Sequence, residues 1–311
     1  MGAAPPLPQD RRAVWRAALY PYLLLSLASL FWAGNWVVGR AVRDSMPPVA
    51  LTFWRWAIAA LLLAPIALPR MGGKAALLRR HWLLLFLLSF TGVALFQALI
   101  YTGLRYTTSV NGVMMNSASP LFIMLVAWLT DRETVTLRQL MGMVVSFAGI
   151  LVIINRGDLA TLSRFSFNPG DLVVLLAMPT WGVYSVLVRR RPPELDPLAL
   201  VFVISLIGAA LLAPIFGLEA WLFATPTFSW RSIASVLYVA CFASIGAYLC
   251  WNRGVELVGP NKAGFTIHLL PAFGTMLAVA TLGEDVHLFH AVGIATILLG
   301  VWLATSARTR R

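Results

Sequence analysis

An internal repeat constrains this chain most, because the same pattern of residues occurs twice, about 150 positions apart. Pro120-Leu121-Phe122 reappears as Pro271-Ala272-Phe273, an offset of 151. The same offset joins further residues without a gap: Gly103 with Gly254, Thr130 with Thr281, Glu133 with Glu284, Gly142 with Gly293, and Gly149 with Gly300. An offset of 149 joins the earlier parts of the halves: Trp32 with Trp181, Arg40 with Arg189, Pro48 with Pro197, and Pro65 with Pro214. So long a repeat in an apolar chain indicates two bundle halves that face each other, rather than a solenoid of short units.

The composition indicates a membrane protein. Hydrophobic residues make up 59% of the chain and charged residues 12%, with a mean hydropathy of +0.81, whereas about a quarter of the residues in soluble domains are charged. About 20 apolar residues span a bilayer as a helix. Such runs occur at residues 17–38, 49–68, 82–104, 109–129, 137–154, 171–190, 197–216, 232–251, 261–281 and 288–306. No small-residue cleavage site accompanies the first run, so we expect an anchor there and not a removed signal peptide.

Positive charge is distributed unequally between the two sides of these ten spans. Of the 24 Lys and Arg residues, 17 lie on the side of the chain ends, six lie on the other side, and Arg55 lies within the second span. The positive-inside rule then places both termini in the cytoplasm. Five spans per repeat is an odd number, so the second repeat enters the membrane inverted relative to the first. We therefore expect an all-α integral membrane protein of ten transmembrane helices, built as two inverted five-helix repeats around a central cavity.

The repeat divides the chain into segments. We expect a cytoplasmic N-terminal tail at 1–16, the first repeat at 17–154, an extracellular or periplasmic linker at 155–170, the second repeat at 171–306, and a basic cytoplasmic tail at 307–311. The net charge of +12 follows the span ends, which favours membrane orientation over nucleic-acid binding.

The first and sixth spans carry matched aromatic faces. Trp32, Asn35 and Trp36 share one face of the first span, and Trp181 and Tyr184 occupy the sixth. Residues three and four apart lie on one side of a helix. These faces either line a cavity or pack two helices together, and we expect them to line a cavity.

Polar residues also match between the third and eighth spans. Gln97 and Tyr101 correspond to Tyr248 and Asn252. A polar side chain facing lipid is costly, so each is expected to face protein or water. Hydrogen-bonded helix packing could explain any one of them, but matched pairs favour a shared central cavity.

The fourth and ninth spans are interrupted at matching points by Pro120 and Pro271. Proline removes a helical hydrogen bond and produces a kink or hinge. Asn111 and Met115 on the fourth span and His268 on the ninth are further candidates for the substrate site. For His268 alone, a buried structural histidine is an equal alternative.

Arg55 is the one cation placed within a span. An ionisable residue inside the membrane is by default a functional hypothesis, yet Arg55 lies about two turns from a helix end, where its side chain could reach the interface. Its counterpart is Ile204, so its structural or gating role is not symmetric.

The fifth and tenth spans carry glycines at matched spacing in apolar surroundings, Gly142 and Gly149 against Gly293 and Gly300. Small residues let helices approach closely, so these spans are predicted to serve packing, and a homodimer could form through them. Glu133 precedes the fifth span, where we expect it to cap the helix.

These features together resemble the drug/metabolite transporter superfamily, in particular its ten-helix EamA-type members. The resemblance covers residues 17–306 and includes Phe31-Trp32-Ala33-Gly34-Asn35, the spacing from Pro48 to Arg55, and the Tyr101…Pro120…Glu133 pattern with its second copy. The chain looks most like bacterial aromatic amino-acid exporters of this group. The resemblance implies a multi-pass protein of the bacterial inner membrane that exports amino acids and related metabolites.

The sequence therefore predicts a transporter and not an enzyme, because no His-Glu-x-x-His motif and no carboxylate pair within a span is present. We expect no cofactor and no metal. The substrate is expected to be a neutral amino acid, aromatic or otherwise hydrophobic, whose ammonium group would be attracted to Trp and Tyr faces. Efflux of aromatic or quaternary-ammonium cations is the alternative, since an aromatic box also suits them.

Overall fold

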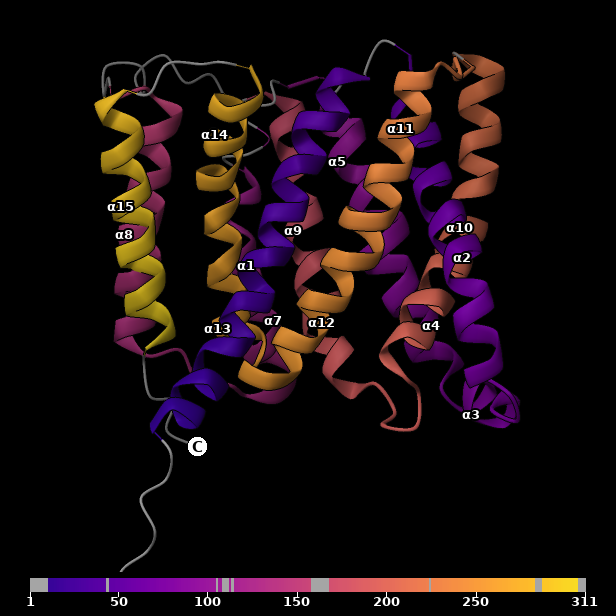
Figure 1. Ribbon diagram of the computed structural model, residues 1–311, viewed down its shortest axis with the longest axis horizontal. Coiled ribbons are helices and arrows are strands. Elements are labelled where there is room, and N and C mark those ends of the chain that lie inside the picture. Colours follow the sequence, from indigo (N-terminus) through magenta and orange to yellow (C-terminus); the bar gives the residue numbers. More distant parts are fainter. Residues whose placement is uncertain are drawn as a thin grey trace, which may run out of the picture.

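The computed structural model describes residues 11–42, 45–104, 106–107, 112, 115–157, 168–223, 225–282 and 287–306. Within these ranges the regular structure is entirely helical, and no strand occurs. The helices stand roughly side by side in a slab (Figure 1), as expected for a bundle that crosses a bilayer.

Every predicted span of the first repeat overlaps a helical segment in the part of the chain that the structure describes. These are α1 (Arg11–Ala41), α2 (Pro48–Arg70), the run α4–η1–α5 (Trp82–Ser89, Phe90–Leu95, Phe96–Leu104), α7 (Ser119–Asp131) and α8 (Leu137–Ile154). The short helix α3 (Ala75–Arg80) lies between the second and third spans.

The second repeat follows the same order. Its segments are α9 (Pro169–Leu187) with η3 (Val188–Arg190), α10 (Pro197–Leu222), the run α11–η4–α12 (Trp230–Tyr238, Val239–Gly246, Ala247–Val258), the run α13–η5–α14 (Pro260–Phe265, Thr266–His268, Leu269–Leu282) and α15 (Leu288–Thr305).

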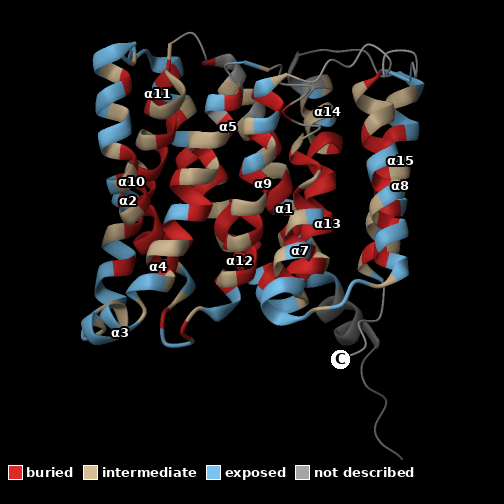
Figure 2. Ribbon diagram, turned by 180° about the vertical axis from the view of Figure 1, so that it is seen from behind, coloured by how far each residue is buried: buried red, intermediate tan, exposed pale blue. Residues whose placement is uncertain are grey.

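Length and composition fit membrane insertion. In the described part of the chain, eight helices are long and apolar enough to cross a bilayer, and α7 is a shorter apolar helix. Large apolar side chains such as Leu61 and Leu137 are more than 70% exposed, which suits a surface that faces lipid. Figure 2 shows buried residues concentrated in the middle of the slab, around α1, α9 and α12.

The packing of α8 on α15 demonstrates the inversion of the two repeats. A Cβ at Gly142 would lie 2.6 Å from the carbonyl oxygen of Gly300, and one at Gly149 would lie 2.7 Å from that of Gly293. Rising numbers on α8 therefore meet falling numbers on α15, so these equivalent helices are antiparallel. Gly142 thus meets the repeat mate of Gly149, and Gly149 meets the repeat mate of Gly142. This is the pairing that a two-fold axis produces.

The predicted packing role of these glycines is thus fulfilled within one chain. Figure 1 shows α8 and α15 together at one edge of the slab. A homodimer through the two helices stays a prediction, and it would have to use their outward faces, where Val144 and Trp302 are more than half exposed.

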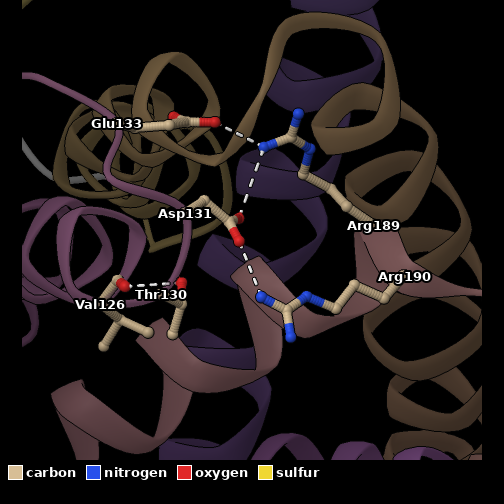
Figure 3. A network of polar contacts seen from close by, with 6 residues as sticks. All are labelled: Val126, Thr130, Asp131, Glu133, Arg189 and Arg190. Atoms are coloured by element: carbon tan, nitrogen blue, oxygen red, sulfur yellow. Dashed lines mark hydrogen bonds and ion pairs between the residues drawn. The ribbon is translucent and has the colours of Figure 1, made fainter.

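Basic residues and acids gather at the end of the slab where the chain terminates. Arg189 pairs with Glu133 at 2.5 Å, and Arg190 pairs with Asp131 at 2.7 Å (Figure 3). The hydroxyl of Tyr22 donates to the carbonyl oxygen of Thr305, which joins the first and last spans. The capping role predicted for Glu133 was wrong: Thr136 is the N-cap of α8, in a capping box with Gln139, and Glu133 pairs with Arg189 of η3 instead.

The opposite end is held by helix capping. The backbone N–H of Ala50 donates to the Glu219 carboxylate at 2.8 Å, so an acid at the end of α10 caps the start of α2. Asp171 caps the start of α9 with Asn168 and accepts a hydrogen bond from Thr107. Both acids are buried, and each places its charge at the N-terminus of the helix that it caps, α2 or α9, where it complements the helix dipole.

Candidate functional site at the interface of the repeats

Two π-helical segments frame the middle of the molecule. η1 covers Phe90–Leu95, η4 covers Val239–Gly246, and the offset of 151 superposes the first on residues 241–246. A π segment disturbs the regular helical hydrogen bonds and is frequent at functional sites. The sequence analysis did not predict these π segments. The only sequence signal identified for them is weak, a small residue, Gly92 or its mate Ala243, within each long apolar run.

The carbonyl oxygens of these two mates accept hydrogen bonds from side chains. The Tyr248 hydroxyl donates to Gly92 at 2.5 Å. The indole Nε1 of Trp32 and Nη2 of Arg55 both donate to Ala243, each at 3.1 Å. The repeats therefore present equivalent acceptors toward their interface and meet different donors there.

Six aromatic side chains meet between these segments, and we call them the central aromatic cluster: Trp32, Trp56, Trp181, Tyr184, Tyr248 and Trp251. The repeat mates Trp32 and Trp181 contact each other edge to face, with ring centroids 5.2 Å apart. Tyr248 contacts both rings at 6.2 and 5.7 Å. The aromatic faces of the first, sixth and eighth spans thus converge and pack against one another, and their predicted lining of a cavity stays a prediction.

Two members of the cluster were not predicted. Trp56 packs against Tyr248 at 4.8 Å, and Trp251 packs against Trp32 at 5.4 Å. Both are fully buried. Neither has an aromatic counterpart in the other repeat, so the repeat pattern that identified Trp32 and Trp181 could not point to them.

One amide side chain is hydrogen-bonded to the cluster, and two further amides lie on α1 and α5. The Tyr184 hydroxyl donates to Oδ1 of Asn252 at 2.7 Å, while Nδ2 of Asn252 has no partner among the residues that the structure describes. Gln97 is 8% exposed, and Oδ1 of Asn35 is buried without a partner. An unpaired buried amide atom is costly, so these groups are suited to a polar ligand.

The remaining candidates are placed differently. Met115 packs with the apolar group around Ile100 and Met178, between α5 and α9. The side chains of Trp36, Tyr101 and Asn111 lie outside the described residues.

Both prolines of the interrupted spans lie in the first turn of a helix that follows a break. Pro120 is the second residue of α7, after a turn at Ser117, and Pro271 is the third residue of α14, after the 3-10 turn η5. The chain is therefore redirected before each proline, and the kink is not within a continuous helix.

His268 joins the two breaks. Its Nε2 lies 2.9 Å from the carbonyl oxygen of Ser117, its own repeat mate, and its Nδ1 lies 2.5 Å from the hydroxyl of Ser146. Because a carbonyl can only accept, Nε2 carries the proton, and in the neutral ring Nδ1 accepts. Both nitrogens are engaged and the side chain is 1% exposed, an arrangement that suits the structural alternative.

Arg55 is buried and 1% exposed, so it does not reach an aqueous interface. Its Nε donates to the Ser244 hydroxyl at 2.8 Å, and its guanidinium carbon lies 5.2 Å from the Trp56 ring centroid. Nη1 has no hydrogen-bond partner within the described ranges. Among the described residues, no carboxylate forms an ion pair with it.

A groove of about 450 Å³ runs between α2 and α10, away from this cluster. Its walls are apolar, among them Phe53, Ala60, Phe202 and Ala213. It lacks the polar groups that fix the orientation of a small-molecule ligand, so the central aromatic cluster is the better candidate.

Comparison with known proteins agrees with this architecture. Residues 19–155 and 168–306 each match the profile of the EamA-like transporter family. An uncharacterized transporter of Archaeoglobus fulgidus is 30% identical over 92% of this chain and 97% of its own length. The uncharacterized transporter YyaM of Bacillus subtilis is 27% identical over 91% of this chain and 93% of its own. One solved crystal structure aligns with a TM-score of 0.75 at 21% identity, covering 92% of this chain and 96% of that one, and this likeness concerns the fold.

Proposed function

Because this chain belongs to the EamA-like transporter family, we propose that it exports amino acids, aromatic and other neutral or hydrophobic ones, together with related metabolites. The substrate is held between the two repeats and is released by alternating access. The protein lies in the bacterial inner membrane with both termini in the cytoplasm, since the Arg- and Lys-rich loops flank the end where the chain terminates.

The observation that carries this proposal is the contact of Trp32 with its repeat mate Trp181 inside a cluster of six aromatic rings. Transporters built from inverted repeats hold substrate near the midplane, where the two repeats meet. Ring faces attract an ammonium group and also pack against an apolar side chain. A hydrophobic amino acid offers both groups.

Hydrogen-bonding capacity beside the cluster suits the zwitterionic end of such a substrate. Asn252 and Asn35 each hold a buried amide atom without a protein partner. Moving an ionic group out of water is costly unless hydrogen bonds replace its hydration. Unpaired amide atoms near aromatic faces supply these bonds.

Counterflow of radiolabelled amino acids in liposomes of the purified protein tests the proposal. We expect Trp181→Ala and Gln97→Ala to lower flux by about tenfold, the loss of one cation–π or charge-assisted contact of roughly 1.4 kcal/mol. Trp221→Ala is the matched control, because that indole is 81% exposed on the outer surface. Unchanged flux in both site variants would reject the assignment of the site.

The alternative substrate class is separated in the same assay. If aromatic or quaternary-ammonium cations compete for flux and amino acids do not, the protein is a cation efflux transporter. The aromatic cluster would serve either class, so competition decides between them.

A further inference from the structure

Arg55 is a buried cation whose hydrogen bonding is incomplete. Two of its nitrogens donate hydrogen bonds within the protein, Nε to the hydroxyl of Ser244 and Nη2 to the carbonyl oxygen of Ala243. Nη1 is buried and has no hydrogen-bond partner in the described part of the chain. A guanidinium stays charged at any physiological pH and is expensive at membrane depth unless it is paired. Both bonds that it makes are to neutral groups, so its charge is not neutralised by any described side chain.

The other repeat shows that helix packing does not require this cation. The equivalent of Arg55 is Ile204, and the equivalent of Ser244 is Val93. Both of these side chains are 0% exposed. One half therefore places a polar pair where the other half fills the same positions with an apolar pair. A structural tether would serve both halves, whereas a ligand contact is needed only once.

The unsatisfied groups around the central aromatic cluster are mostly donors. Besides Nη1 of Arg55, the buried atoms without a partner include Nε1 of Trp56, Nε1 of Trp251 and Nδ2 of Asn252. The unpaired atoms that can accept include Oδ1 of Asn35 and Oδ1 of Asn261, and the hydroxyls of Ser185 and Ser205 can donate or accept. Donors and a fixed positive charge favour a ligand that accepts hydrogen bonds and carries negative charge.

We propose that Arg55 is the anion-binding residue of this transporter and that its Nη1 binds the carboxylate of the substrate. This inference rests on the proposed function and sharpens its substrate class. Because Arg55 has no counterpart in the second repeat, the site takes a single carboxylate. The aromatic rings take the hydrophobic part of the molecule. The buried acids in the described part of the chain lie at helix ends, so the carboxylate is the charged group of the substrate that meets an opposite charge, while the ring faces attract its ammonium.

Competition with the unmodified protein gives the first test and needs no variant. Phenylalanine counterflow is measured against excess phenylalanine methyl ester, phenethylamine and 3-phenylpropanoate, and binding of labelled 3-phenylpropanoate is measured directly. We expect 3-phenylpropanoate to bind and compete, while the ester and the amine compete at least about tenfold more weakly, as for loss of a charge-assisted bond. Equal competition by the ester would overturn the proposal.

Variants give the second test. Arg55→Gln is expected to weaken 3-phenylpropanoate binding by about tenfold or more and to leave that of the ester within about twofold. Arg55→Lys keeps the charge without the planar fork and is expected to fall between. If Arg55→Gln does not fold, the comparison rests on Arg55→Lys. Arg231→Gln is the control, because that arginine is exposed at the start of α11.

The outcomes separate this inference from the proposed function. If Arg55→Gln keeps the preference for carboxylate over ester, the inference fails even though amino-acid export stands. If the unmodified protein binds 3-phenylpropanoate through Arg55 and moves no amino acid, export of amino acids fails and the anion site stands.

Discussion

The first and second repeats use the same backbone features and carry different polar side chains on them. Both contain a π segment at the equivalent place, and in each the carbonyl oxygen of the equivalent residue, Gly92 or Ala243, accepts a side-chain hydrogen bond. Yet the tyrosine that donates to Gly92, Tyr248, is the mate of a glutamine, Gln97. The backbone has been kept similar while the chemistry has diverged.

The backbone features and the polar side chains differ in this way because they serve different functions. In an inverted-repeat transporter the two halves alternate between conformations about one fixed site, so both need the same breaks and the same close helix contacts. The substrate is not symmetric, so the groups that bind it need not be. The contrast between Arg55 and Ile204 is the sharpest instance.

The largest expected effect tests the symmetric part of this comparison. In Gly149→Ala the new Cβ would lie 2.7 Å from the carbonyl oxygen of Gly293, and in Gly300→Ala it would lie 2.3 Å from the nitrogen of Ser146. We expect each variant to lower the free energy of unfolding by about 3 kcal/mol, because backbone atoms cannot yield to an added methyl group. Reversible unfolding in mixed detergent micelles measures this energy.

The control is Gly217→Ala on α10, where a Cβ would meet nothing within 4 Å. It is expected to be neutral or slightly stabilising, since alanine is the better helix former by about 1 kcal/mol. Because Gly149 and Gly300 are repeat mates, their losses should agree within about 1 kcal/mol. A loss confined to one of them would contradict the two-fold pairing of α8 with α15.

Much of the architecture could be predicted because it depends on periodic properties of the sequence. Length and hydropathy located the spans, and their odd number per repeat required the inversion now seen in the antiparallel α8 and α15. The inward faces of Trp32 and Trp181 followed from the repeat itself. When two repeats meet on a two-fold axis, residues near that axis that match at a fixed offset in the sequence lie close together in space.

The features that the sequence did not predict depend on contacts between distant residues, which no local sequence pattern records. A π segment differs from an α-helix by one residue per turn, and packing around η1 and η4 decides between them. Trp56 and Trp251 look like ordinary apolar residues of a span until their neighbours are known. For Glu133, the better cap Thr136 three residues later leaves the carboxylate to pair with Arg189.

A moderate effect is expected at the junction of the two breaks, where the halves contribute unlike groups. His268 offers a side chain, while its mate Ser117 offers a backbone carbonyl. We expect His268→Leu to lower the free energy of unfolding by about 2 kcal/mol, because it removes two buried hydrogen bonds. His81→Leu, in the turn between α3 and α4, is the control and should change stability by less than about 0.5 kcal/mol.

Flux per folded molecule distinguishes the two roles of His268. A structural histidine predicts that His268→Leu transports nearly normally once its lower stability is taken into account. A substrate ligand predicts the reverse, loss of transport at unchanged stability, and that result would restore His268 to the binding site.

The smallest expected effect is at the basic end, where an exposed ion pair joins the two repeats. Arg189 in η3, directly after α9, pairs with Glu133 after α7 (Figure 3), and the arginine side chain is 36% exposed. Exposed pairs contribute about 0.2–1 kcal/mol. Arg189→Gln should therefore leave stability nearly unchanged, yet 1 kcal/mol shifts an equilibrium between two open states by about fivefold. We expect the variant to favour opening at the basic end.

Because the repeats are inverted, the equivalent ion pair can be tested at the opposite end of the molecule. The repeat mates of Arg189 and Glu133 are Arg40 and Glu284, on the opposite side of the membrane in the predicted topology, and their side chains lie outside the described residues. If the halves alternate symmetrically, Arg40→Gln should favour opening at that opposite end. The apparent affinity for substrate added to either side of oriented vesicles measures both shifts, which should be opposite in sign. Both should vanish near 1 M salt, where the screening length falls to about 3 Å. Shifts of the same sign would mean that the two ends do not close in turn, and that the resemblance between the repeats is confined to their packing.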